Sequence, residues 1–441
     1  MIAINKKFFQ NMFKTITYSL FKIIYKKIEK ISDEKNSNEI KIKNIKKSED
    51  LKYQVYIVKN GRVYTDRISD TAVILKNEII EKVSFQFRVI NSRVYNADIK
   101  QNIVFSKGTP RLQKKIKGNV LSLLTGGGGN SNYWHWLFDV IPRIAFCEEI
   151  IKNDKIDFYL LPSNKIKFQK ETLNLLGINK EKQLSSENFR HIICDKLFVT
   201  SHPVLRSPDA TGSIQNIPKW ISDWLKNTFV LKKNNKNFFK KIYIDRSDSI
   251  SNVKHLRTIE NEEEVKNYLS SVGFEIVKLS EYSFKDQVSM FNAAETIIGL
   301  HGAGFANIVF SKPNTKIIEL KTKSHLGKEI ENLAKSNNLP FKALKFDLIG
   351  EETATQFGHI NVSINEDLTI AAKRELYEET GVKTVKIIND IGYIKKGSIG
   401  RGFGAWSRGA KIRDVLKLSG MPVSLSEEDW RLLTADRIED V

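Results

Sequence analysis

Short apolar runs bounded by polar turns recur along the chain from residue 51 onward. Runs such as VLSLL at 120–124 and FYLLP at 158–162 are typical of buried strands. Between them lie segments whose apolar positions repeat every three or four residues, which predicts helices, as over 168–176. Strands that alternate with helices in this way favour a parallel α/β sheet.

A second set of alternating strands and helices begins near residue 240. Its predicted strands are KIYID at 241–245, FEIVKL at 274–279, TIIGL at 296–300 and IIEL at 317–320. A stretch with three prolines and many lysines, residues 203–239, separates the two sets. We therefore expect an α/β protein with two Rossmann-like domains, residues 51–225 and 226–350, and a ligand-binding cleft between them.

The two ends of the chain depart from this pattern. In residues 1–30, seven lysines and one acid accompany apolar residues spaced three and four apart, which predicts a basic amphipathic helix. Such a helix is typical of contact with an anionic membrane surface, and the alternative is a helix packed on its own domain. Residues 31–50 are polar and lack periodicity, which predicts a linker, and residues 351–441 are predicted to form a separate tail.

Composition narrows the class of protein. The 71 basic and 51 acidic side chains give a net charge of +20, but no nucleic-acid-binding motif accompanies this charge, so we expect no nucleic-acid partner. Cys147 and Cys194 have neither metal-ligand spacing nor a disulfide pattern, which favours a reducing compartment. The sequence contains no apolar stretch long enough for a membrane span and no secretory signal. We therefore expect a cytoplasmic protein, with peripheral contact at the inner face of the cell membrane.

The motif NYWHWLFDVIPR at 132–143 places His135 and Asp139 about one helical turn apart. A carboxylate beside an imidazole fixes the tautomer and stabilises the charged form, as a general base requires. We expect this pair to be catalytic, with Asn132 and Arg143 as supporting residues, and either member of the pair could be the base. The alternative is a helix start capped by Asn132, with His135 as a core histidine.

The motif GLHGAGFAN at 299–307 follows a predicted strand and opens a helix. Its glycines allow phosphate oxygens to approach backbone N–H groups at the positive end of that helix. The nucleotide-binding residues expected in this motif are His301, Gly302, Ala303, Gly304 and Asn307. The alternative is a tight turn between strand and helix that holds no ligand.

Three charged residues near other strand ends complete the predicted donor site. Arg246 and Arg257 could clamp a diphosphate through forked hydrogen bonds. Glu319, at the end of the IIEL strand, could accept a ribose hydroxyl. The alternative for each of the three is ordinary surface charge in contact with solvent.

Together these motifs resemble glycosyltransferase family 61, which includes bacterial capsular polysaccharide enzymes and eukaryotic xylosyl- and N-acetylglucosaminyltransferases. The resemblance covers roughly residues 50–345 and rests on the two motifs above, on IYIDRSD at 242–248 with Arg257, and on the whole of 279–320. It implies a GT-B-like fold and an inverting, metal-independent transfer from a nucleotide-sugar donor to a glycan acceptor in surface polysaccharide biosynthesis. The absence of a D-x-D sequence agrees with a transfer that needs no metal cofactor.

The tail contains a second resemblance. Most of a Nudix box, whose carboxylates gather Mg²⁺ around a diphosphate, is matched by Glu366, Arg374, Glu375, Glu378 and Glu379. The box lacks its leading glycine, and too little chain surrounds it for the sheet of that fold, so we interpret it as a fragment. Two alternatives to the glycosyltransferase therefore stand: a Mg²⁺-dependent Nudix pyrophosphohydrolase, and a non-catalytic protein that binds membranes or polyanions.

Overall fold

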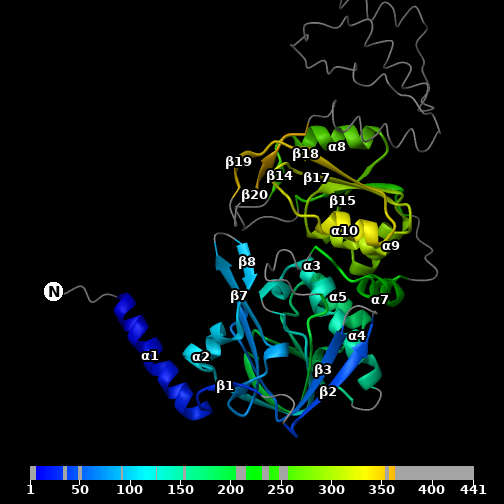
Figure 1. Ribbon diagram of the computed structural model, residues 1–441. Helices are drawn as coiled ribbons and strands as arrows, with labels where there is room; N and C mark the ends of the chain where they lie inside the picture. The colour runs from blue at the N-terminus through cyan, green and yellow to red at the C-terminus, as the bar shows by residue number, and fades with distance from the viewer. Residues whose placement is uncertain are drawn as a thin grey trace, which may run out of the picture.

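The computed structural model describes residues 6–32, 37–47, 52–90, 93–125, 127–151, 155–204, 215–230, 238–247, 257–352 and 357–362. These residues form two α/β units, which we call the first unit, up to residue 204, and the second unit, from residue 238 (Figure 1). Helix α7 (Lys219–Phe229) lies between them along the chain. The prediction of an α/β protein is confirmed.

The first unit is built on a mixed sheet of twelve strands. Its strands are β1 (Lys30–Ile31), β2 (Ile40–Lys46), β3 (Lys52–Lys59), β4 (Arg62–Thr65), β5 (Asp70–Leu75), β6 (Glu78–Ile79), β7 (Phe85–Ile90), β8 (Arg93–Asn96), β9 (Lys114–Ser122), β10 (Phe158–Leu161), β11 (Gln183–Ser185) and β12 (His191–Thr200). Its α-helices are α1 (Lys6–Tyr25), α2 (Ile103–Lys107), α3 (Tyr133–His135), α4 (Pro142–Ile151) and α5 (Lys167–Leu175).

Only part of this sheet has the parallel arrangement expected for a Rossmann-like domain. Strands β12, β9, β10 and β11 are parallel neighbours in that order, whereas β3 and β4 pair antiparallel with β12. Strands β4, β5 and β6 follow one another as antiparallel hairpins. Their short turns can only reverse the chain, because a parallel neighbour needs a crossover of a dozen or more residues. The Rossmann-like prediction is therefore wrong for the strands before β9.

Strand β2 lies inside the segment 31–50 that the sequence predicted as a linker. It pairs antiparallel with β3 from Ile40 opposite Val58 to Lys46 opposite Lys52. The side chains of Ile40 and Ile45 are buried. Ile40 and Ile42 alternate with lysines and contact one core cluster, whereas Ile45 follows Asn44 out of step and is buried in the other cluster on the opposite face. The broken alternation and the many lysines conceal the strand in the sequence.

The second unit contains a five-stranded sheet in which all neighbours are parallel. Its strands are β13 (Lys241–Asp245), β15 (Glu275–Lys278), β16 (Thr296–Leu300), β17 (Lys316–Thr322) and β18 (Phe341–Phe346), and its helices are α8 (Glu262–Ser271), α9 (Phe284–Ala293), α10 (Glu329–Ser336) and the 3₁₀ helix η7 (Ala303–Phe310). The spatial order β15-β13-β16-β17-β18 is that of a doubly wound sheet. In such sheets the ligand lies at the carboxyl ends of the two strands where the order reverses, here β13 and β16.

A small sheet extends the second unit beyond its predicted end at residue 350. It joins β14 (Thr258–Ile259), β19 (Ile349–Glu352) and β20 (Phe357–Ile360), with β14 parallel to β20. Ile360 and Val362 are buried in a cluster with Ile259 and Tyr243. The first residues of the predicted tail therefore belong to the second unit, because their apolar side chains complete its core.

The two units share a hydrophobic cluster that continues from one to the other. Helix α7 spans the predicted boundary at residue 225, and its Leu225 and Phe229 are part of this cluster. The ring of Phe229 packs edge-on against Phe284 at 5.0 Å and Phe310 at 6.4 Å between centroids. This interface fixes the position of the carboxyl ends of β13 and β16 relative to the first unit. The ligand-binding cleft that the sequence predicted between the two units stays a prediction. None of the helices among the described residues is long and apolar enough to cross a membrane.

Candidate functional site

His135 and Asp139 form a hydrogen-bonded pair, with 2.5 Å between Nδ1 and Oδ2. Asn132 caps the start of the helix, because its Oδ1 accepts from the backbone N–H of Trp134 at 2.9 Å. A single π-helical turn, η4 (Trp136–Val140), follows α3 and ends before Pro142. The Asn132 cap and the wide turn together fix the helix start that carries the predicted catalytic pair, and wide turns of this kind are frequent at functional sites.

The charged form of this pair is stabilised by its own partners. Burial opposes charge on both side chains, but the negative charge and hydrogen bond of Asp139 outweigh it and raise the pKa of His135. Burial likewise works against Asp139, yet the charge and hydrogen bond of His135, with weaker contributions from His202 and Arg143, lower the pKa of Asp139. Since Nδ1 is committed to Asp139, Nε2 is the nitrogen that can take a proton from an acceptor.

Arg143 is fully buried and ties the helix to the sheet. Its Nε donates to the carbonyl of Asp139 at 3.0 Å and its Nη1 to the carbonyl of Leu124 at 2.8 Å. The guanidinium also lies over the ring of Phe85, at 4.8 Å from the centroid. Arg143 therefore ties the helix that carries His135 and Asp139 to the sheet, and its supporting role in catalysis stays a prediction.

Arg246 and His301 meet at the carboxyl ends of β13 and β16, where the strand order of the second sheet reverses. Arg246 Nη1 donates to the carbonyl of His301 at 2.5 Å. A Cβ on Gly302 would lie 2.8 Å from Arg246 Cζ, and a Cβ on Gly304 would lie 2.9 Å from Leu279 Cδ1. The glycines thus make room for neighbouring side chains, Arg246 above all, at the start of η7.

His301 is buried and held by a carboxylate. Its Nδ1 is hydrogen-bonded to Glu319 Oε1, and Lys321 Nζ lies 3.2 Å from the other oxygen of Glu319. Burial, with the neighbouring imidazole of His325 and the positive charge of Arg257, lowers the pKa of His301 well below its usual value. Burial also raises the pKa of Glu319 to about 7, although Lys321 opposes this. The structure thus places Glu319 against His301 rather than at an open strand end.

Three residues that the sequence did not single out join this site: Lys321 at the end of β17, His325 in the loop after it, and Glu329 as the first residue of α10. The rings of His301 and His325 lie 4.1 Å apart, and Arg257 Nη2 donates to His325 Nδ1 at 3.2 Å. Glu329 Oε1 lies 3.6 Å from His325 Nε2, beyond hydrogen-bond distance. Burial acts against the charge of Glu329, but the neighbouring imidazoles of His325 and His301 lower the pKa of this carboxyl to about 2. The signal was available, because residues just past the carboxyl end of a parallel strand are where α/β ligands bind.

His301, His325 and Glu329 each offer a ligand atom within 4.8 Å of the others, which is close enough for the three to hold a metal ion. Two features of the cluster favour an anion instead. A guanidinium can only donate a hydrogen bond, so Nδ1 of a neutral His325 must accept the bond from Arg257 and the ring proton lies on Nε2. Nε2 is the nitrogen that faces Glu329, so it presents a proton there rather than a lone pair for a metal ion. The positive charges of Arg257 and Lys321 also oppose a divalent cation and attract phosphate.

Asn307 connects the two predicted sites. Its Oδ1 accepts from the hydroxyl of Tyr133 at 2.5 Å, and its Nδ2 donates to Gln287 Oε1 at 3.0 Å. Tyr133 precedes His135 by two residues, and Asn307 follows Gly304 by three. The structure therefore brings the helix of the catalytic pair against η7, with Asn307 buried in that contact.

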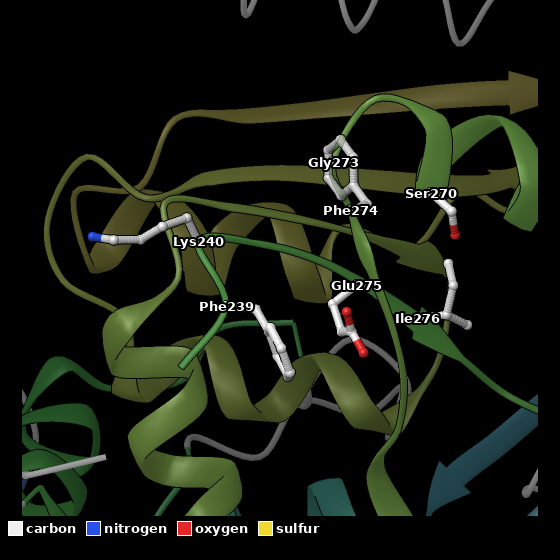
Figure 2. A pocket seen from close by; sticks show the side chains of 7 residues that line it. All are labelled: Phe239, Lys240, Ser270, Gly273, Phe274, Glu275 and Ile276. Atoms are coloured by element: carbon white, nitrogen blue, oxygen red, sulfur yellow. The ribbon is translucent and has the colours of Figure 1, made fainter. Parts of the chain in front are cut away.

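A surface hollow of about 400 Å³ lies elsewhere on the second unit (Figure 2). Its lining includes Lys240, Phe274 and Glu275, which stand at the amino ends of β13 and β15. Lys240 is already paired with Glu295, at 2.5 Å between Nζ and Oε1. Because ligands in doubly wound sheets bind at the carboxyl ends, this hollow is not the candidate site. The residues of the Nudix-like segment, Glu366 to Glu379, lie outside the described part of the chain.

Comparison with known proteins indicates a class of protein. The glycosyltransferase 61 family model matches residues 133–318, which contain both the His135 helix and the His301 loop. A β-1,2-xylosyltransferase from Arabidopsis thaliana is 31% identical over 120 residues, which are 23% of this chain and 22% of that protein. Residues 133–318 therefore match glycosyltransferase family 61, and the resemblance seen in the motifs is confirmed. The match spans less than a quarter of the length of that curated relative.

Proposed function

We propose that this protein is an inverting glycosyltransferase of GT-B type that moves a sugar from a nucleotide sugar to a glycan acceptor without a metal ion. The observation that carries the proposal is the hydrogen bond between Tyr133 and Asn307. This bond joins two segments from different units. One is the helix in the first unit that carries His135 and Asp139, and the other is the glycine-containing turn after β16 in the second unit. A base on one side and a phosphate-binding turn on the other are what sugar transfer requires.

The donor diphosphate binds at the carboxyl ends of β13 and β16. Arg246 lies directly against the turn, and the N-terminus of η7 adds backbone N–H groups. Arg257 and Lys321 add positive charge beside His301. These groups neutralise the charge that develops on the leaving diphosphate.

In the transfer step the acceptor hydroxyl oxygen attacks C1 of the donor sugar. The bond from C1 to the diphosphate oxygen breaks with inversion, and the electron pair leaves with the nucleoside diphosphate. His135 Nε2 takes the proton of the acceptor, and Asp139 stabilises the imidazolium that forms. Glu319 holds His301 in one tautomer and so acts as a positioning residue in the donor site.

The class of acceptor follows from the family resemblance. The Arabidopsis relative is a xylosyltransferase by name, and the bacterial enzymes that these motifs resemble build capsular polysaccharide. We therefore assign this chain to surface polysaccharide biosynthesis in the cytoplasm. Its cysteines, Cys147 and Cys194, are free and buried, as suits a reducing compartment.

The test is a screen of nucleotide sugars for thermal stabilisation of the full chain, followed by transfer assays with the best donor. A donor at a hundred times its Kd adds about 2.7 kcal/mol of stability. Arg246→Ala should weaken binding of that donor at least about tenfold, because a charged hydrogen-bond donor is lost. Lys323→Ala, which removes an exposed charge from the same unit, is the matched control and should leave affinity unchanged. Equal affinity in both variants would contradict the assigned site.

A further inference from the structure

Helix α1 exposes a continuous apolar face. Its exposed apolar side chains are Met12, Phe13, Ile16, Leu20, Ile23 and Ile24, with exposed fractions from 44% to 78%. At 100° per residue these positions fall within an arc of about 120°, a single stripe along the helix. Scattered apolar residues on a surface need no explanation, but a contiguous stripe marks an interaction site.

The opposite face of α1 is anchored to the first unit. Lys22 Nζ donates to the carbonyl of Ser106 at 2.5 Å, and Tyr25 OH accepts from the backbone N–H of Gln113 at 2.9 Å. The ring of Tyr25 also packs edge-on against His191 at 4.8 Å. These contacts hold the last turns of α1 against the first unit and leave the apolar stripe exposed, while the helix projects away from the unit toward its amino-terminal end (Figure 1). The helix therefore contacts its own domain through its last turns, as the alternative expected, but its apolar stripe does not take part in that contact.

Charge decides which kind of partner fits the stripe. No acidic residue occurs in α1, and Lys14, Lys26 and Lys27 are exposed on or just after it. A second copy of the chain would bring two such lysine-rich helices together, so like charges would repel. A surface of anionic lipid headgroups complements the lysines, while the acyl chains beneath accept the apolar stripe.

We propose that α1 docks the protein on an anionic lipid surface, lying in the plane of the headgroups with its apolar stripe inserted. The helix has 20 residues, but lysines interrupt its apolar sequence, so it lies on the bilayer rather than across it. The docking is independent of the sugar-transfer site, whose residues lie on other elements. Stable binding to the lipid surface needs both the apolar stripe and the positive charge of the lysines, because either one alone binds a membrane only weakly.

Sedimentation of the full chain with lipid vesicles tests the docking. Vesicles of phosphatidylcholine alone are compared with vesicles that contain about one third phosphatidylglycerol, at low and high salt. The chain should bind the anionic vesicles at least about tenfold more strongly, and high salt should weaken that binding because it screens the lysines. Equal binding to both vesicle types, or binding to neither, overturns the proposal.

Substitutions in α1 test the contribution of the apolar stripe and that of the lysines to vesicle binding separately. The triple variant Phe13→Ser/Ile16→Ser/Ile23→Ser should lose binding at least about tenfold. Ile68→Ser removes one equally exposed apolar side chain elsewhere and should bind like the parent chain. Lys14→Gln/Lys27→Gln should reduce the preference for anionic vesicles and the salt dependence together.

Two further measurements distinguish lipid docking from misfolding and from self-association. Because the substituted side chains are exposed, the triple variant should keep the melting temperature and the nucleotide-sugar affinity of the parent chain. Sedimentation equilibrium without lipid should show the same mass for the parent and the triple variant. If the parent is a dimer that the triple variant dissociates, a second copy covers the stripe and the proposal is wrong. Retained vesicle binding by the triple variant is equally contrary to it.

Discussion

The chemistry of the His135–Asp139 pair is set by a contact between two side chains. Asp139 is nearly buried, whereas a quarter of the His135 side chain is exposed. A base that faces the acceptor while its partner is shielded keeps its orientation during turnover. The raised pKa of His135 means that the imidazole is protonated over a wider pH range than usual and becomes a base only above that pKa.

The pH profile of kcat tests this role. For His135 as base, kcat should rise with pH through a pKa above the usual 6.5, because only neutral imidazole accepts a proton. Asp139→Asn removes the charge that stabilises the imidazolium, so the rising limb should move to lower pH while the plateau falls. His135→Ala should lower kcat by about 10²–10⁴ with donor affinity within about twofold. An unchanged kcat in both variants would show that the pair only packs the start of the helix.

At the scale of elements, the turn between β16 and η7 leaves little space for a Cβ atom at either of its two glycines. Gly302 has an extended φ of 169°, so its backbone is open to any residue, and only the nearby guanidinium of Arg246 requires glycine. Gly304 approaches the flexible end of Leu279 instead. The two glycines of the motif therefore differ in what a methyl group would displace.

Alanine substitutions at these two glycines should have unequal effects. Gly302→Ala must push Arg246 away from the turn, and donor affinity should fall by about 1.5–3 kcal/mol, as for loss of a charged hydrogen bond. Gly304→Ala should cost affinity less, because the Leu279 methyl can rotate aside. Isothermal titration with the donor nucleotide checks both. Equal losses would mean that the glycines serve the backbone rather than Arg246.

At the carboxyl ends of β16 and β17, two histidines and the carboxylate of Glu329 lie close to the positive side chains of Arg257 and Lys321. That balance of charge leads us to expect that transfer persists in EDTA, with the diphosphate neutralised by Arg246, Arg257 and Lys321. The measurement is the initial rate before and after chelation. Loss of transfer that added Mn²⁺ restores would instead indicate a metal at His301, His325 and Glu329.

At the scale of the whole molecule, the two units are joined by a buried polar contact within a largely apolar interface. Tyr133 and Asn307 lie 174 positions apart in sequence. Burial raises the pKa of Tyr133 well above its usual value, so the hydroxyl remains a donor at any physiological pH. Such a contact fixes how the base and the donor turn face each other.

Tyr133→Phe should affect both stability and turnover. Removing the hydroxyl leaves Asn307 Oδ1 without this donor in a buried place, which costs about 1–3 kcal/mol of unfolding free energy. Urea denaturation with an unchanged slope measures this loss. We also expect kcat to fall more than donor affinity, because the relative position of the two units is loosened. A stable variant with parental kcat would show that the contact is dispensable.

Several features of this protein follow from its sequence alone. Apolar runs predicted the parallel strands β10, β13, β15, β16 and β17, because strands of a sheet covered by helices carry mostly apolar side chains. The spacing of His135 and Asp139 predicted their contact, since helical geometry is local. The motifs also predicted the resemblance to glycosyltransferase family 61, whose model matches residues 133–318.

The tertiary structure decided what depends on contacts between distant segments. The antiparallel pairing among β2 to β6 depends on which strands lie next to each other in the folded chain. The lysine-rich segment β2 can be identified as a strand only from its pairing with β3. His325, Lys321 and Glu329 join the site because β17 lies next to β16, and Asn307 faces Tyr133 because the two units pack together. The amphipathic pattern of α1 was visible in the sequence, but only the fold shows that its apolar stripe is left exposed. Local periodicity specifies elements, whereas their neighbours are chosen by burial of the whole chain.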